Sequence, residues 1–179
     1  DGEYGLASAD MDNDGITDLV VGARDSQEMI VGLGNGNGTF TFQAAQSAGG
    51  SVWVGVVGDV NGDGNIDVAT ANDGSGNGAI LLGNGDGTFD PPTTYNIGAH
   101  TASSDLGDLD GDGDLDWVLS AFGAGLWRIY ENDGNGNFTI VDDTIAPSNP
   151  SCAVLLDFDN DGDLDMVLTD EIADRVVLM

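Results

Sequence analysis

The chain has 179 residues, of which 40% are hydrophobic, and this length suits one ordinary domain. It carries 32 Asp and Glu against three Lys and Arg, a formal net charge of −29 that excludes nucleic acid and disfavours anionic membrane surfaces as partners. Its single cysteine, Cys152, excludes an intrachain disulfide, and no apolar run reaches the roughly 18 to 20 residues of a membrane-spanning helix.

A nine-residue acidic motif occurs four times, at residues 10–18, 59–67, 108–116 and 157–165. Successive copies begin 49 residues apart, and each has glycine at its sixth position. Such a fixed period indicates a repeat architecture.

A glycine-rich segment follows the first three copies in the same frame, at residues 34–40, 83–89 and 132–138. Each of these segments ends in Phe, and these Phe residues are again 49 apart. The chain therefore divides into repeat units at residues 1–49, 50–98, 99–147 and 148–179, the last of which is incomplete.

Each unit is expected to form short strands in a set order. In the second unit, apolar runs precede the acidic motif at residues 52–57, follow it at 68–70, and recur at 79–82. A polar fourth segment begins at Thr88 and contains two prolines, as tolerated on an edge strand. Four strands per 49-residue unit are typical of a propeller blade. We predict an all-β fold, a β-propeller or propeller segment of four-stranded antiparallel blades, with about four blades in this chain.

The acidic motif has the composition of a cation-binding loop. Two like charges about 4 Å apart repel by ~4 kcal/mol at an effective dielectric constant of ~20, and basic residues to offset this are nearly absent. A hard divalent cation resolves the repulsion through oxygen ligands at positions 1, 3, 5 and 9 and a backbone carbonyl at position 7. Calcium is favoured over magnesium, because the ligand set is supplied wholly by the protein. Asn61 stands at position 3 of the second copy, which predicts weaker binding there.

Two alternatives compete with this interpretation. The helix–loop–helix calcium motif requires a bidentate Glu at position 12, where this chain has Val21, Thr70, Leu119 and Leu168. The acidic residues could also form turns through local side-chain hydrogen bonds alone. Four copies in phase, each with Asp at position 9, favour a bound cation.

The pair of motifs resembles the FG-GAP/VCBS repeat. The pattern Asp-x-Asp-x-Asp-Gly-x-x-Asp-Leu is followed by a strand and then by Leu-Gly-Asn-Gly-Asp-Gly-Thr-Phe, here at residues 82–89. The repeat forms the blades of integrin α-subunit propellers and of many secreted propellers. The resemblance implies about four calcium ions, one per repeat, in the hairpin between the first two strands of each blade. The metal-binding positions that it implies are Asp10, Asp12, Asp14, Ile16, Asp18, Asp59, Asn61, Asp63, Asn65, Asp67, Asp108, Asp110, Asp112, Asp114, Asp116, Asp157, Asp159, Asp161, Asp163 and Asp165.

Propellers of this family usually have more blades than this chain supplies. The chain is therefore expected to be an excerpt, a partial ring that assembles with other copies, or an unusually small propeller. Strand connectivity places the acidic loops and glycine-rich turns at one end of the blades. The loops at residues 24–28, 73–78, 122–125 and 170–174 lie at the other end and differ between units, so a partner is expected to dock there.

No arrangement of nucleophile and base is apparent, and no catalytic residue or organic cofactor is expected. His100 is interpreted as a solvated loop residue, and Cys152 and Trp117 as core residues. The remaining aromatic residues considered are expected to pack between strands rather than against a sugar: Trp53, Tyr95, Trp127 and Tyr130. Asn37 and Asn137 match the N-glycosylation acceptor and also suit a turn.

Calcium is expected to stabilise the fold. Extracellular modules bind it at ~10⁻⁴ to 10⁻³ M. At about 1 mM calcium, a site of ~10⁻⁴ M adds ~1.4 kcal/mol, and four such sites add roughly 6 kcal/mol. The function expected is that of an extracellular structural, adhesion or assembly module that binds protein or polysaccharide at a cell surface or in a matrix. The alternatives are a calcium-dependent lectin-like propeller and the non-catalytic propeller of a larger secreted polysaccharide-active enzyme.

Overall fold

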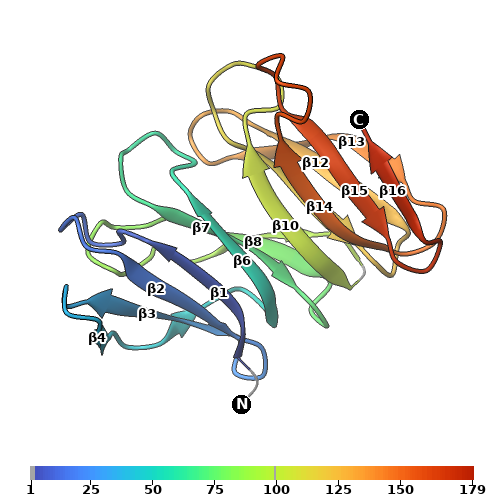
Figure 1. Ribbon diagram of the computed structural model, residues 1–179. Coiled ribbons are helices and arrows are strands. Elements are labelled where there is room, and N and C mark those ends of the chain that lie inside the picture. Colours follow the sequence, from blue (N-terminus) through green and yellow to red (C-terminus); the bar gives the residue numbers. More distant parts are fainter. Residues whose placement is uncertain (1–2, 99) are drawn as a thin grey trace.

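The computed structural model describes residues 3–98 and 100–179, which form four successive antiparallel sheets (Figure 1). Blade 1 contains β1 (Glu3–Ala9), β2 (Asp18–Ala23), β3 (Glu28–Gly34), β4 (Phe40–Phe42) and the short β5 (Gln46–Ser47). Blade 2 contains β6 (Val52–Gly58), β7 (Asp67–Asn72), β8 (Asn77–Leu81) and β9 (Thr93–Asn96). Blade 3 contains β10 (Thr101–Gly107), β11 (Asp116–Ala121), β12 (Leu126–Asn132) and β13 (Phe138–Ile145). Blade 4 contains β14 (Pro150–Leu156), β15 (Asp165–Asp170) and β16 (Arg175–Leu178).

The blades are arranged around their first strands. Within each sheet the main strands pair in chain order, and β5 pairs with β3 beside that path. The strands β1, β6, β10 and β14 lie side by side across the middle of the molecule (Figure 1). The sheets form an open arc of blades rather than a closed ring among the described residues. This arrangement is the predicted β-propeller segment. Within the described part of the chain, no helix has the length and apolar character needed to cross a membrane.

The outer strands depart most from the sequence prediction. In blade 2 the fourth strand starts at Thr93 rather than at Thr88, and Phe89 makes only an isolated bridge to Gly83. Pro91 and Pro92 lie between, and neither has an N–H to donate to a sheet ladder. In blade 1 the outer edge is divided between β4 and β5.

The hydrophobic core lies between neighbouring blades. Every residue of β7 and β11, the second strands of the two middle blades, is buried. Between blades 2 and 3, the rings of Trp117 and Tyr130 stack with centroids 5.1 Å apart, and Tyr95 packs edge-on against Trp117 at 5.6 Å. These contacts fix the angle between adjacent blades and hence the positions of the loops at both ends.

Each first strand carries an irregularity near its beginning. The pairing register between first and second strands shifts at Glu3/Gly5, Val52/Val54, Thr101/Ser103 and Pro150/Cys152. A bulge of this kind redirects a side chain out of the regular alternation. In blades 2, 3 and 4 the residue inside the bulge is Trp53, Ala102 or Ser151.

Candidate functional site

The position-9 Asp joins the two turns at the acidic end of each of the first three blades. The Asp18 carboxylate accepts hydrogen bonds from the backbone N–H of Met11 at 2.7 Å and of Gly34 at 2.7 Å. Asp67 accepts from Val60 and Gly83, and Asp116 from Leu109 and Asn132. Because these three carboxylates are buried, they tie the acidic loop to the glycine-rich turn in the interior. This second role for position 9 was not predicted from the sequence.

The position-1 Asp organises the loop itself. The two carboxylate oxygens of Asp10 accept from the N–H of Asp14 at 3.1 Å and of Gly15 at 2.8 Å. Asp59, Asp108 and Asp157 each accept from the position-6 glycine in the same way. That glycine has a positive φ in every copy, between 83° and 103°, where a side chain would be strained. The loop conformation is therefore built from Asp and Gly at the spacing that the sequence repeats.

Three of the four loops bring carboxylates into one group. The groups are Asp10 with Asp12 and Asp18, Asp108 with Asp110 and Asp116, and Asp157 with Asp159 and Asp165. In each group, one ligand oxygen per residue lies within 4.8 Å of the others. Oxygens bound to one calcium ion at 2.3 to 2.6 Å lie at most about 5 Å apart, so these groups fit a calcium ion. In the second loop the amide of Asn61 takes the place of the third carboxylate, and its Nδ2 donates to Asp63.

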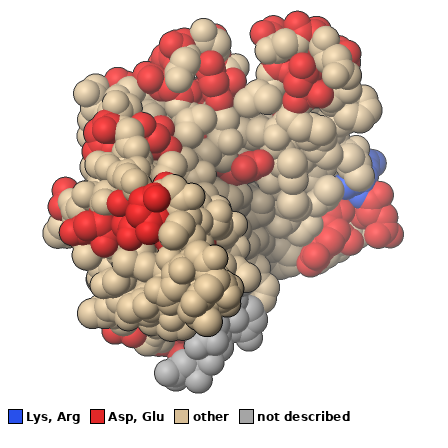
Figure 2. Space-filling model, turned by 60° about the vertical axis from the view of Figure 1, so that its left-hand side comes forward, with Lys and Arg blue, Asp and Glu red and all other residues tan. Residues whose placement is uncertain are grey.

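Mutual repulsion and partial desolvation act on these carboxyls. Desolvation, followed by the charges of Asp14, Asp18 and Asp10, raises the pKa of Asp12. The charge of Asp161 is the main cause of the raised pKa of Asp159. Figure 2 shows the carboxylates on this side of the molecule gathered in separate clusters, with one small basic group at the edge of the view. A cation held in a loop would remove this repulsion.

The position-5 and position-7 residues have other contacts. The carboxylates of Asp14 and Asp63 each accept from the N–H two residues later, at 2.7 Å. Asn65 accepts from the Asn13 side chain of the neighbouring blade at 2.9 Å. The ligand roles assigned to the position-5 side chains and position-7 carbonyls stay predictions.

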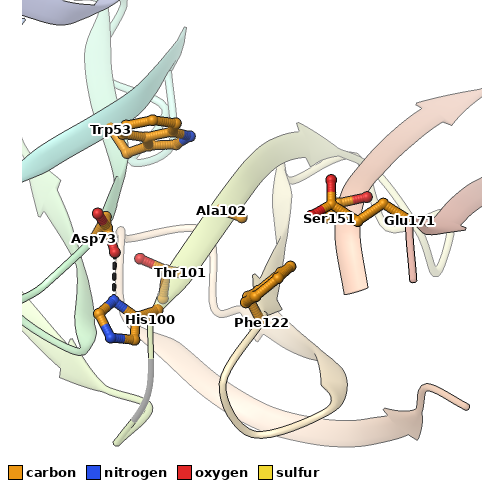
Figure 3. A pocket seen from close by; sticks show the side chains of 8 residues that line it. All are labelled: Trp53, Asp73, His100, Thr101, Ala102, Phe122, Ser151 and Glu171. Atoms are coloured by element: carbon orange, nitrogen blue, oxygen red, sulfur yellow. Dashed lines mark hydrogen bonds and ion pairs between the residues drawn. The ribbon is translucent and has the colours of Figure 1, made fainter. Parts of the chain in front are cut away.

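A pocket of about 470 Å³ lies at the opposite end of the blades. It is lined by Trp53, Asp73, His100, Thr101, Ala102, Phe122, Ser151 and Glu171. Figure 3 shows Trp53 and the Asp73–His100 pair on one side, Ser151 and Glu171 on the other, and Phe122 between them. Aromatic surface and hydrogen-bonding groups thus face one space, as is usual in ligand sites.

The pocket is built from positions that correspond in the repeat. Trp53, Ala102 and Ser151 are the bulged residues of three first strands, and they lie 49 residues apart. Asp73, Phe122 and Glu171 begin the loops after three second strands and have the same spacing. Both sets combine residues of different chemistry in adjacent blades. The pocket therefore lies at the loop end of the blades, where the repeat is least uniform.

Charged contacts shape one wall of the pocket. Asp73 accepts from Arg24 of blade 1 and pairs with the His100 ring, both at 2.5 Å. The Arg24 guanidinium carbon lies 5.6 Å from the centroid of the Trp53 ring, in reach of a cation–π contact. Desolvation acts to raise the pKa of Asp73, but hydrogen bonds and charges from His100 and Arg24 lower it overall. The charged groups of this wall are thus paired with one another.

The structure tests what the sequence predicted for the aromatic residues, His100 and Cys152. Trp117, Trp127 and Tyr130 are buried and pack between blades as predicted. Trp53 is a half-buried pocket residue rather than strand packing, because the bulge turns it toward the opening. His100 is largely exposed, as expected of a loop residue, yet it pairs with Asp73 across two blades. Cys152 is half-buried rather than enclosed in the core.

Asn37 and Asn137 are exposed and both take part in turn hydrogen bonds. Asn37 accepts from the Thr39 N–H at 3.0 Å, and Asn137 donates to Asp133. Whether either carries a glycan stays a prediction from the sequence.

The match to one solved propeller structure agrees with the fold, and a second, weaker match is also found. Among solved structures, an Agrocybe aegerita lectin that recognises non-reducing terminal N-acetylglucosamine matches with a TM-score of 0.57 and 21% identity. The match covers 90% of this chain and 45% of the lectin, so this chain spans about half the length of that relative. BBS1N in complex with ARL6DN matches with a TM-score of 0.49 and 12% identity, over 97% of this chain and 63% of the other.

No curated protein sequence matches the chain. The model of the FG-GAP-like repeat matches three times in overlapping windows, at residues 10–70, 59–119 and 108–168. Each window runs from one acidic motif through the strand after the next, so together the matches follow the blades seen in the structure. The chain therefore belongs to the FG-GAP-like repeat family.

Proposed function

We propose that this chain is an extracellular propeller module, stabilised by calcium, which serves adhesion or assembly rather than catalysis. The observation that carries the proposal is the grouping of position-1, position-3 and position-9 carboxylate oxygens within 4.8 Å in three loops. Several protein carboxylates around one point suit calcium better than magnesium, which usually keeps several of its water ligands. Extracellular calcium concentrations match the affinity range of such modules.

Bound calcium would supply the positive charge that these loops lack. The chain's own residues already set the loop conformation, since Asp10 and its counterparts hold the loop N–H groups and position 9 ties the loop to the interior. The groups present in loops one, three and four would hold an ion with three carboxylates each, and the second loop with two and Asn61. Four divalent ions would bring the formal charge from −29 to about −21.

The test is calorimetric titration of the chain with calcium, joined to thermal melts in calcium and in EDTA. We expect EDTA to remove roughly 6 kcal/mol, a fall in Tm of about 12 to 24 °C. Asp110→Asn should weaken one site about tenfold, to the level expected of the second loop with Asn61, whereas the exposed Asp90→Asn, outside the loops, should leave the titration unchanged. A melting temperature that is the same in calcium and EDTA would refute the proposal.

Carbohydrate binding is the second candidate function, and the pocket at the opposite end favours it. Trp53 and Phe122 offer ring surface for the apolar face of a sugar, while Glu171, His100 and Ser151 offer hydrogen-bonding groups. The lectin neighbour recognises a terminal N-acetylglucosamine, which makes that sugar the first probe. The net charge of −29 disfavours acidic polysaccharides.

A glycan array of the calcium-loaded chain, with an EDTA-treated control, tests this candidate. We expect neutral or N-acetylated glycans to bind and Trp53→Ala to abolish the signal. Phe42→Ala is the matched control, because Phe42 is equally aromatic but lies exposed on the outer edge of blade 1. A blank array from a folded, calcium-loaded sample would leave adhesion through a protein partner as the function.

A further inference from the structure

Blade 4 presents an apolar face that no described part of the chain covers. Phe158, Val176 and Leu178 on this blade are 59%, 67% and 52% exposed. In blades that have a following neighbour, most of the same repeat positions are at most 9% exposed: Met11 and Val60 for Phe158, Met29 and Trp127 for Val176, and Val31, Ile80 and Ile129 for Leu178. Leu109, the counterpart of Phe158 in blade 3, is half-buried. This face of blade 4 is as apolar as the equivalent faces of the other blades, but no described blade packs against it.

What covers those counterparts is the next blade of the same repeat. Trp127 and Ile129 of blade 3 pack with Ala153 and Leu168 of blade 4 in one cluster. Hydrogen bonds also join the two blades. The Ala153 N–H donates to the Ser103 side chain at 3.0 Å, and the Leu155 N–H donates to the Asp105 side chain at 2.8 Å. Blade 4 therefore offers the kind of surface on which another blade of this family packs.

Blade 1 offers the complementary surface on its own free side. Leu6 is 67% exposed, whereas the residues at its position in blades 3 and 4, Ser104 and Ala153, are buried, and Ala153 packs against blade 3. Leu19 and Val21 are half-buried, although their counterparts Trp117 and Leu119 in blade 3 are fully buried. The two ends of the arc are thus the two halves of one blade–blade contact.

The sizes of the residues at these two ends are matched. Within the arc, a Cβ added to Gly58 would lie 2.6 Å from Leu115 Cδ1, and one added to Gly107 would lie 2.6 Å from Leu164 Cδ1. In blades 3 and 4, a leucine of the acidic loop therefore fills the space over a glycine of the preceding blade. On the free faces the large and small residues are exchanged. Blade 4 has Leu156 at the position of Gly58 and Gly107, and blade 1 has the smaller Thr17 at the position of Leu115 and Leu164.

We propose that the free face of blade 4 binds the free face of blade 1 in a second copy of this chain. The exchange of large and small residues between Leu156 and Thr17 favours this occupant over an unrelated protein. The contact is head-to-tail, so it closes into a ring or continues as a chain.

Charge opposes this contact and sets its salt dependence. Where blades 3 and 4 meet, Asp108 and Asp110 of one acidic loop line the same groove as Asp163 of the next. The proposed contact places residues 157–165 of one copy beside residues 10–18 of the other in the same way. Because salt screens exposed charges, association should strengthen with sodium chloride even without calcium.

The experiment is sedimentation velocity of the whole chain over a concentration series, at low and high sodium chloride, with calcium and with EDTA. We expect the mass to rise from one copy to two or more, with the strongest association at high salt. Leu6→Glu and Val176→Glu should each abolish association, because each places a carboxylate on one of the two faces. Ile172→Glu is the matched control, since Ile172 is also 59% exposed but lies in the β15–β16 loop.

Mixing Leu6→Glu with Val176→Glu, each expected to be monomeric, tests whether the contact is head-to-tail. Leu6→Glu keeps an intact blade 4 face and Val176→Glu an intact blade 1 face, so the mixture should form a one-to-one dimer. A wild-type chain that stays monomeric under all conditions overturns the proposal, as does association of Leu6→Glu with itself. Thermal melts of each variant show that loss of association is not loss of folding, because both residues are exposed.

Discussion

The two ends of the blades use the same repeat for opposite purposes. At the acidic end, equivalent positions carry the same group, and Asp18, Asp67 and Asp116 make the same pair of backbone hydrogen bonds. At the loop end, equivalent positions carry different groups, as with Arg24, Asp73, Phe122 and Glu171. Uniform residues therefore hold each blade together, whereas the varied residues build one asymmetric pocket.

The largest expected difference between the ends is in stability. In EDTA, Asp67→Ala should destabilise the fold by about 2 to 6 kcal/mol, because two buried N–H groups, of Val60 and Gly83, lose their acceptor. Asp73→Ala should cost at most about 1 kcal/mol, because its partners Arg24 and His100 reach solvent. Urea unfolding followed by circular dichroism measures both.

EDTA is essential in this comparison, since Asp67 is also a predicted calcium ligand. If Asp73→Ala destabilised the chain as much as Asp67→Ala, the loop end would also be structural. The pocket would then have no separate role.

The second difference is in pH dependence, because carboxyls at the two ends shift in opposite directions. At the acidic end, desolvation raises the pKa of Asp12, Asp67 and Asp116, with backbone hydrogen bonds opposing it. At the loop end, desolvation acts upward on Asp170, but the N–H groups of Ala173, Ser148 and Asn149 lower its pKa overall. Asp63, Asp86 and Asp133 are exceptions at the acidic end, where hydrogen bonds from the Asn65 N–H, the Thr88 hydroxyl and the Asn137 side chain, respectively, lower the pKa.

A raised pKa means that the folded state binds the proton more tightly than the unfolded state. In EDTA, stability should therefore increase as the pH falls from neutral toward the ordinary Asp value of 3.8. Below that value the groups with lowered pKa, such as Asp73 and Asp170, become protonated and their stabilisation is lost. Thermal melts across pH in EDTA should show a maximum near this value, and a steady fall from pH 7 would contradict it.

In calcium the same melts should change direction. Protonation of the loop carboxylates displaces the ion, so stability should decrease as the pH falls from neutral. The difference between the two curves isolates the acidic end, because the loop end has no predicted calcium ligand.

Much of the fold could be predicted because the 49-residue period aligns every apolar run with its counterparts. The first three strands of blade 2 match the predicted runs at residues 52–57, 68–70 and 79–82, within a few residues at each end. The start of the outer strand of blade 2 could not be predicted. Pro91 and Pro92 cannot donate to the sheet, so β9 begins only after them, and only the structure shows that pairing starts at Thr93. Polar edge strands have little hydrophobic pattern to locate them.

The acidic loops were predictable as loops, but the second role of position 9 was not. The spacing of 16 residues from Asp18 to Gly34 recurs in blades 2 and 3 and is visible in the sequence. That the carboxylate bonds to both turns depends on how the hairpins lie in space. The loop end was predicted to dock a partner because its loops differ between units, and Asp73, Phe122 and Glu171 of the pocket lie in these loops. The contribution of Trp53 to the pocket could not be predicted, because it depends on the bulge in β6.

The smallest expected effect tests which loop residues are ligands. Asn61→Asp supplies the second loop with the third carboxylate that the other loops have, and should tighten calcium binding there about tenfold, ~1.4 kcal/mol. Without calcium the same change should destabilise the fold by about 0.5 to 1.5 kcal/mol, because Asn61 Nδ2 no longer donates to Asp63 at 3.1 Å. Calorimetric titration separates this weaker site from the other three.

The matched control lies in the same loop and adds the same charge. Asn65→Asp changes position 7, where blades 3 and 4 already have Asp114 and Asp163 and where only the backbone carbonyl is a predicted ligand. Its effect on calcium affinity should therefore be well below that of Asn61→Asp. Equal effects of the two substitutions would mean that net loop charge, rather than ligand position, determines affinity. In that case the acidic loops would tolerate changes in which position carries a carboxylate. The acidic end would then differ from the loop end only in its charge.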